Sequence, residues 1–125
     1  MLLRRQTGVA RILLNEEVLA ERLEGRGFRI LCPTEHSVDE ILDVCMDAKV
    51  VVGVEGSNLC HALLVMQAGA TLVTLQPPHR FNNILKTYCD GLGMRYAFTV
   101  GHSSPEGFFV EPEALDRLLD RVGAA

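Results

Sequence analysis

The sequence predicts an α/β protein, a single Rossmann-like three-layer sandwich whose mostly parallel sheet has four or five strands. Two observations lead to this prediction. Apolar, β-rich runs alternate with helical patterns along the whole chain, and residues 49–54 contain consecutive valines without polar alternation. Such a run is typical of a strand that is buried on both faces, as strands are in parallel sheets of the Rossmann-like or flavodoxin-like kind.

Composition limits the class of protein. The 125 residues, 48% of them hydrophobic, fit one globular domain spanning residues 1–125. A net charge of −4 disfavours nucleic acid and anionic membranes as partners. No apolar run reaches transmembrane length and the start of the chain does not resemble a signal peptide, so we expect a cytoplasmic protein.

The cysteines are widely spaced and form no metal-binding pattern. We expect them to be buried, reduced side chains, and we expect no disulfide, no metal and no cofactor. They are Cys32, Cys45, Cys60 and Cys89.

Helix and strand signals can be placed in order. Asn15 is a residue type that caps helices, and it precedes a predicted helix over 16–25. That helix has an apolar stripe of Leu14, Val18, Leu19 and Leu23. Further helices are predicted after the capping box of Ser37 and Glu40, and over 58–67, 82–91 and 112–122. Strands are predicted over 1–3, 28–32, 49–54, 71–75 and 95–99, with 101–107 as a loop and 108–110 as a last edge segment.

The segment after the valine run is the first candidate site. Gly53 and Gly56 allow a tight turn, and Ser57 and Asn58 are residue types that begin helices. A helix that starts there directs its free N–H groups at the strand end, which suits a phosphate. An ordinary capped turn is the alternative. Glu55, in the same turn, is a candidate general base or hydroxyl acceptor, or a partly exposed acid with no chemical role.

Two groups of basic residues are further candidates. Arg4, Arg5 and Arg11 stand out in an acidic chain, and forked guanidinium groups suit the paired oxygens of a diphosphate. Arg80, in a Pro-Pro-His-Arg segment after the fourth predicted strand, is a second anion contact. A solvated surface and a rigid loop are the respective alternatives.

The order of several short motifs resembles a known family. Arg4-Arg5 is followed by Arg11 to Glu16, then Gly27-Phe28, Ser37-Val38 and Ala48 to Val52. The pattern continues with Glu55 to Leu59, Gly69-Ala70, Leu75 and Pro77, Leu92-Gly93 and Tyr96, and Val110 to Pro112. This order is similar to the carboxy-terminal half of family 61 glycosyltransferases, which occur in bacterial capsular and exopolysaccharide loci and in O-linked glycosylation.

The resemblance implies a GT-B enzyme, in which two Rossmann-like domains face a cleft and the carboxy-terminal domain holds a nucleotide-sugar donor without a metal. This chain looks like that donor domain alone. By position, Arg5, Arg11, Asn15 and Glu16 match the family's Arg…Asn-Glu segment, and Gly56, Ser57 and Leu59 match its His-Gly-Ala-x-Leu loop. The chain departs from the family at four positions: Glu55 replaces the loop histidine, His61 an asparagine, Ile41 a glutamine and Thr74 an acid.

The function implied is the nucleotide-sugar-binding domain of a glycosyltransferase, which transfers a sugar from a nucleoside-diphosphate donor to a carbohydrate or other hydroxyl acceptor. The residues assigned to donor and phosphate binding are Arg5, Arg11, Asn15, Glu16, Gly56, Ser57, Asn58, Leu59 and Arg80, with Glu55 as the catalytic candidate. The alternative is a non-catalytic α/β module that binds a partner or forms a homodimer through the surface left by a missing amino-terminal domain.

Overall fold

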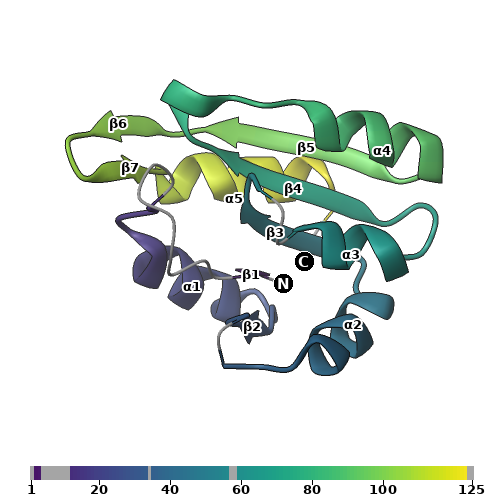
Figure 1. Ribbon diagram of the computed structural model, residues 1–125. Helices are drawn as coiled ribbons and strands as arrows, with labels where there is room; N and C mark the ends of the chain where they lie inside the picture. The colour runs from purple at the N-terminus through teal and green to yellow at the C-terminus, as the bar shows by residue number, and fades with distance from the viewer. Residues whose placement is uncertain (1, 4–11, 34, 57–58, 124–125) are drawn as a thin grey trace.

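A parallel sheet lies at the centre of the molecule (Figure 1). The computed structural model describes residues 2–3, 12–33, 35–56 and 59–123. Within these ranges, five strands form one sheet in the order β2-β1-β3-β4-β5, and all of its neighbouring pairs are parallel. The strands are β1 (Leu2–Leu3), β2 (Ile30–Leu31), β3 (Val50–Val54), β4 (Thr71–Gln76) and β5 (Arg95–Val100).

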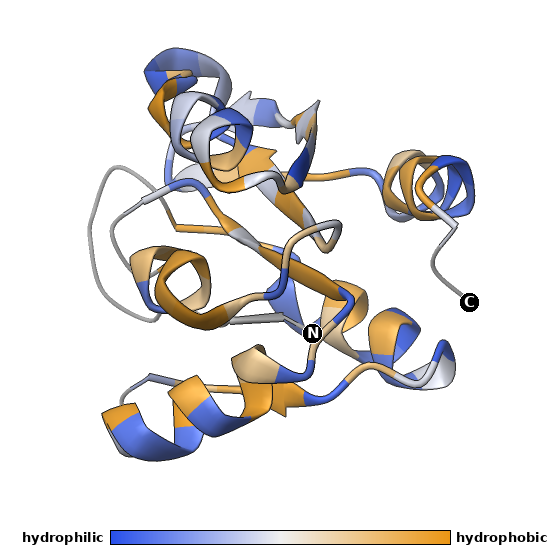
Figure 2. Cartoon of the chain, turned by 90° about the vertical axis from the view of Figure 1, so that its right-hand side faces the viewer, coloured by the Kyte–Doolittle hydropathy of each residue, from blue (hydrophilic) through white to orange (hydrophobic). Residues whose placement is uncertain are grey.

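Helices cover both faces of this sheet. One core cluster joins α2, α3 and α4 to the sheet, and a second joins α1 and α5 to its other face. In Figure 2 the hydrophobic colour concentrates in the strands, between helices that carry both colours. The helices are α1 (Glu16–Gly25), α2 (Val38–Met46), α3 (Cys60–Val65), α4 (Ile84–Leu92) and α5 (Pro112–Arg121), with a 3₁₀ turn η3 (Pro78–Arg80). The predicted α/β class with a parallel sheet is confirmed.

The two central strands explain why the valine run predicts a buried strand. Val51 of β3 and Leu72 of β4 face the α2–α3–α4 side, whereas Val52 and Val73 face the α1–α5 side, and all four are fully buried. A strand covered on both faces has no solvent side and therefore needs no polar alternation.

The capping box before α2 is also confirmed. The Glu40 backbone N–H donates to Ser37 Oγ over 3.2 Å, and the Ser37 N–H donates to Glu40 Oε1 over 3.3 Å. The bond from the Ser37 N–H to the carboxylate, together with a bond from the Ser37 hydroxyl to the same oxygen, lowers the pKa of Glu40 from its ordinary value of 4.5.

Several predicted elements are shorter in the structure. The expected strand over 28–32 is reduced to Ile30–Leu31, and the expected helix over 58–67 is reduced to Cys60–Val65. That helix ends because Met66 has extended dihedrals, with ψ at 145°, and it begins after Leu59. The predicted caps Ser57 and Asn58 lie outside the described residues.

The sequence predicted a loop over residues 101–107, but this segment is not a simple loop in the structure. It contains β6 (His102–Ser104) and part of β7 (Gly107–Phe109), which form an antiparallel hairpin. The hairpin is extended by residues 12–14: the Phe108 N–H donates to the Ile12 carbonyl over 3.0 Å, and the Leu14 N–H donates to the Phe108 carbonyl over 2.8 Å. The supporting segment is remote in sequence, which is why local patterns missed this element.

The apolar stripe predicted for α1 was only partly correct. Leu19 and Leu23 are buried, but Leu14, which precedes the helix, and Val18, which lies within it, are exposed. Ala20 is buried instead, so the buried face of α1 is rotated relative to the predicted stripe. The four cysteines are free, as expected, but Cys60 is exposed and only the other three are buried.

Within the described part of the chain, no helix combines the length and apolar character needed to cross a membrane.

Candidate ligand-binding site at the carboxyl ends of the strands

The segments that follow parallel strands emerge at one edge of the sheet. At this edge, on the left in Figure 1, lie the hairpin β6–β7, the turn η3 and the start of α1. The chain after β3 and the chain after β4 leave the sheet there side by side, because β3 and β4 pair in parallel up to Val54 and Leu75. The structure thus brings the Glu55 turn and the Arg80 segment to the same edge.

Glu55 is the most buried acidic residue of this edge, with 5% of its surface exposed. Its backbone N–H donates to the Leu75 carbonyl over 3.1 Å and so continues the β3–β4 ladder by one residue. Buried carboxylates are held by partners, because an isolated ionised carboxylate is costly to remove from water. The Glu55 carboxylate is therefore suited to accept hydrogen bonds from hydroxyls or to pair with cations at the end of the strand.

Gly56 and Leu59 are the described residues between Glu55 and α3. Gly56 has φ at 153°, a value that favours glycine, and its carbonyl accepts from the Leu59 N–H over 3.2 Å. Leu59, one of the predicted donor-binding residues, is 1% exposed and packs in the core cluster of α2, α3 and α4. Its side chain anchors the turn and does not face the edge.

A polar network lies under the segment that follows β4. The fully buried Gln76 amide donates to the Asn82 carbonyl over 2.8 Å and accepts from the Asn82 N–H over 3.2 Å. The Tyr96 hydroxyl lies 3.2 Å from Gln76 Nε2 and 2.8 Å from Thr74 Oγ1. The two-point pairing fixes residues 77–82 over the end of β4.

This pairing positions Arg80. The Arg80 N–H donates to the Pro77 carbonyl over 3.1 Å within η3, and the next residue, Phe81, packs edge-to-face on Phe98 with ring centroids 5.2 Å apart. The Arg80 side chain is exposed. An exposed guanidinium on a fixed turn is suited to an anionic ligand.

Asn15 does not have the capping role that the sequence predicted. Its side chain makes no cap hydrogen bond. Instead Nδ2 donates to the Val110 carbonyl over 2.6 Å, and Oδ1 accepts from the Val110 N–H over 3.1 Å. The Asn15 side-chain amide thus bonds to both backbone groups of Val110, as the backbone of a neighbouring strand would. Glu16 occupies the first turn of α1, and Arg5 and Arg11 lie outside the described residues.

His61, at a position where the chain departs from the family pattern, is not fully satisfied. Its Nδ1 is buried and has no hydrogen-bond partner among the described residues. Ile41, another such position, is a core residue with 1% exposure. Thr74 belongs to the polar network around Gln76. Ile41 and Thr74 therefore occupy structural positions, whereas Glu55 lies at the carboxyl edge of the sheet.

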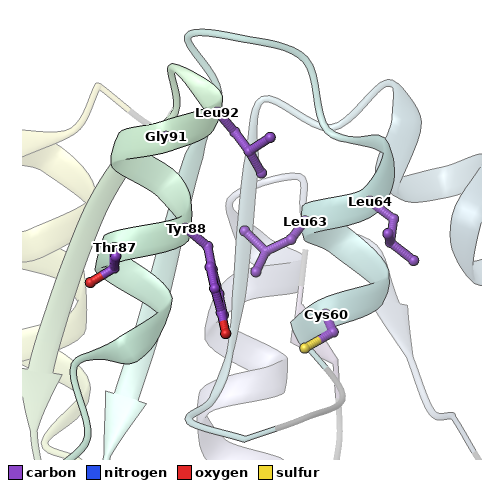
Figure 3. Close-up of a pocket in the computed structure, with 7 residues that line it drawn as sticks. All are labelled: Cys60, Leu63, Leu64, Thr87, Tyr88, Gly91 and Leu92. Carbon is purple, nitrogen blue, oxygen red and sulfur yellow. The ribbon is translucent and has the colours of Figure 1, made fainter.

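The exposed Cys60 lines a second, apolar feature. A groove of about 580 Å³ runs between α3 and α4, and Leu63 and Tyr88 extend into the space between the helices (Figure 3). The groove is lined by Cys60, Leu63, Leu64, Thr87, Tyr88, Gly91 and Leu92.

Two of the buried cysteines are poorly ionised at neutral pH. Burial raises the pKa of the Cys45 and Cys89 thiols, and the nearby Asp90 raises the pKa of Cys89 further.

The sheet order and the polar edge define a class of α/β proteins that bind ligands beyond the carboxyl ends of parallel strands. Residues 1–73 match the model of the family described as Glycosyltransferase 61. The match covers more than half of the chain, and the chain belongs to glycosyltransferase family 61. The matched range includes β1, β2, β3 and the Glu55 turn, and it ends within β4. A comparison with curated proteins finds no match for this chain.

Sequence reasoning found the Glu55 turn and the Arg80 segment but missed the Gln76 network. The sequence contained a signal for this network, because Thr74 and Gln76 are polar residues that alternate with the apolar Val73 and Leu75 at the end of β4. Polar side chains in a strand with no solvent face need buried partners. The Tyr96 hydroxyl supplies one of them.

Proposed function

We propose that this chain is the donor-binding, Rossmann-like domain of a GT-B glycosyltransferase, and that it holds a nucleoside-diphosphate sugar at the carboxyl edge of its sheet. Membership of family 61 gives glycosyl transfer as the general chemistry. The donor class, the GT-B arrangement and the site residues are our proposal.

One observation carries the proposal. The chain passes from the central strand β1 outward to β2, and then returns to the other side of β1 to form β3. In open α/β sheets, ligands bind at the point where the strand order reverses, outside the carboxyl ends of the strands. In the sequence, residues 4–11 follow β1 and residues 55–59 follow β3. These segments carry Arg5, Arg11, Glu55, Gly56, Ser57 and Asn58.

These residues supply complementary chemistry. Arg5 and Arg11 neutralise the diphosphate, and the backbone N–H groups of the turn at Gly56 donate hydrogen bonds to its remaining oxygens. Arg80 adds a third cation from the neighbouring turn. Because charge develops on the leaving diphosphate as the glycosidic bond breaks, fixed donors and cations lower the barrier.

Glu55 has a different role in this proposal. A carboxylate repels phosphate, so Glu55 accepts hydrogen bonds from donor hydroxyls or pairs with an arginine. The base that deprotonates the acceptor then comes from another domain, and the chain alone binds the donor without turning it over. Binding needs no metal, and EDTA is expected to leave it unchanged.

The test is a thermal-shift panel with UDP, GDP, CDP and their sugars. A ligand at a hundred times its Kd stabilises the native state by about 2.7 kcal/mol, which is a shift of several degrees for a domain of this size. We expect one nucleotide to produce the shift, and Arg5→Ala and Glu55→Gln to reduce it.

The matched control is Arg29→Ala, which removes an exposed arginine just before β2 that is not among the residues assigned to donor binding. The shift with this variant should equal that of the unmodified chain. If no nucleotide shifts the melting temperature, or if Arg29→Ala weakens binding as much as Arg5→Ala, the proposed donor site is wrong.

A second candidate is a non-catalytic module that binds a partner or forms a homodimer. The exposed apolar residues of the α3–α4 groove favour it, with Leu64 at 76% and Leu92 at 53% exposure. Gel filtration with light scattering separates the two candidates, since a dimer that Leu64→Ser dissociates, in the absence of any nucleotide shift, supports the second.

A further inference from the structure

The outer edge of β5 and the neighbouring side of α5 form a groove that is separate from the carboxyl edge. β5 is the last strand of the sheet. The groove has a volume of about 260 Å³ and is lined by Phe98, Thr99, Ala114, Arg117, Leu118 and Arg121. One wall is therefore a strand edge and the other a helix face with two arginines.

The backbone of β5 presents unpaired groups on this side. The Arg95 N–H donates to the Ala70 carbonyl over 2.8 Å, and the Gly101 N–H donates to the Gln76 carbonyl over 2.9 Å. In a parallel ladder, every second residue directs both backbone groups to the same neighbour. Tyr96, Phe98 and Val100 therefore direct theirs away from β4, and no hydrogen bond to these groups is present among the described residues.

Charge distinguishes the two sides of α5. On the side facing α1, Asp116 pairs with Arg22 over 2.8 Å and Asp120 pairs with Arg26 over 2.8 Å. On the side facing β5, Arg117 and Arg121 are exposed and have no ion pair with any described residue. The helix thus satisfies its acids within the fold and leaves two cations at the groove, in a chain of net charge −4.

We propose that this groove binds an extended acidic polypeptide segment, which adds to the sheet as a strand beside β5. The free backbone groups of Tyr96, Phe98 and Val100 recognise a peptide backbone, and a row of carboxylates pairs with Arg117 and Arg121. Because successive residues of a strand face opposite sides, the segment carries acidic residues at every second position. Its intervening apolar residues meet Phe98 and Val100, which are 41% and 46% exposed on the other face of β5.

A second copy of the chain fits this groove less well. Two β5 edges that pair about a two-fold axis bring the arginines of both copies toward the same interface, and like charges oppose that contact. The charge of the groove therefore selects an acidic partner. The inference does not depend on the proposed donor site.

The experiment titrates three fluorescein-labelled peptides of about eight residues, a usual strand length, into the whole chain. In the first, valine and aspartate alternate; in the second, valine and lysine alternate; the third has the composition of the first in two blocks. We expect fluorescence anisotropy to detect binding of the first peptide alone. We expect Arg117→Glu with Arg121→Glu to weaken it by roughly tenfold or more.

The matched control is Arg29→Glu with Lys49→Glu, which changes the net charge equally at exposed residues that do not line the groove. It should retain binding. A second pair of variants tests the strand edge: Val100→Pro removes an outward N–H group and should abolish binding, whereas Val100→Thr should not.

Amide hydrogen exchange gives a signature that a surface charge effect would not produce. Bound peptide should protect the N–H groups of Tyr96, Phe98 and Val100, while those of Ala97 and Thr99 already donate to β4 and change little. Uniform protection, equal binding of the block peptide, or full displacement by tripolyphosphate would overturn the proposal in favour of a simple anion site. A dimer that Val100→Pro dissociates would overturn it in favour of a second copy.

Discussion

Strands β4 and β5 lie side by side, and each has six residues, but their environments are opposite. Every residue of β4 is buried, whereas every residue of β5 is half-buried or exposed. Both are apolar, β-rich segments in the sequence. The difference comes from position: β4 has a strand on each side, and β5 has one side open. The comparison shows that a strand's place in the sheet decides which of its residues are essential to the fold.

A third strand completes the comparison. β7 also lies at an edge, but residues 12–15 cover it through backbone hydrogen bonds and through the Asn15 amide. Uncovered strand edges are sites where other chains add. The molecule thus contains a strand paired on both sides, an edge strand covered by its own chain, and an edge strand that remains open.

The largest effect is expected for Leu72→Ala in β4. Leu72 is fully buried in the core cluster of α2, α3 and α4, and removing such a side chain leaves a cavity. We expect the free energy of unfolding in urea to fall by about 3 kcal/mol. The control is Leu64→Ala, the same substitution at a residue that is 76% exposed, which should change it by less than about 0.5 kcal/mol. Similar losses for the two variants would contradict the structure.

The next effect is expected for Gln76→Leu. Leucine preserves the volume but leaves the Asn82 backbone groups without their partner, and it removes one of the two partners of the Tyr96 hydroxyl. We expect a loss of about 2 kcal/mol in urea unfolding, because buried polar groups without partners are costly. Gln67→Leu, at an exposed glutamine, serves as the control. A nucleotide-binding measurement on the Gln76 variant would also show whether the displaced Arg80 turn weakens the proposed donor site.

Asn15→Asp distinguishes a helix cap from a strand-like pairing. Aspartate caps helices as well as asparagine does, so a true cap would tolerate the change. In the structure, aspartate loses the donor to the Val110 carbonyl and places a carboxylate beside that oxygen. We expect a loss of about 1–2 kcal/mol at pH 7 by urea unfolding. A variant as stable as the unmodified chain would mean that the cap interpretation was correct after all.

The smallest effect is expected for Phe98→Thr in β5. Phe98 is 41% exposed, and its main ring contact is the edge-to-face packing on Phe81. We expect a loss of about 1 kcal/mol or less, since threonine suits a strand and little buried surface is removed. A loss as large as that of Leu72→Ala would show that the β5 edge is covered in solution.

The sequence predicted the central part of the molecule well, because β3 and α2 depend on local signals. The valine run ends at Val54 as expected, and the Ser37 capping box forms. Local signals failed where distant segments meet. The pairing of Asn15 with Val110, the hairpin supported by Ile12, and the Gln76 network all join residues whose proximity only the fold creates.

The candidate site shows the same division. Glu55 and the glycine turn could be read from the strand-to-helix pattern, and the structure brings Arg80 to the same edge. The core role of Leu59 could not be read, since an apolar residue after a turn fits either a ligand contact or an anchor. Arg5, Arg11, Ser57 and Asn58 remain predictions from the sequence.

The hairpin β6–β7 holds the described residues just before α1. The Ile12 carbonyl accepts from the Phe108 N–H, and the Phe108 carbonyl accepts from the Leu14 N–H. Gly107 permits this close approach, since a Cβ there would lie 2.3 Å from the Ile12 carbonyl oxygen. A side chain at position 107 would therefore push apart the two backbones that carry Ile12 and Phe108. The entry of the chain into α1 thus depends on a glycine that is remote in the sequence and that only the fold brings there.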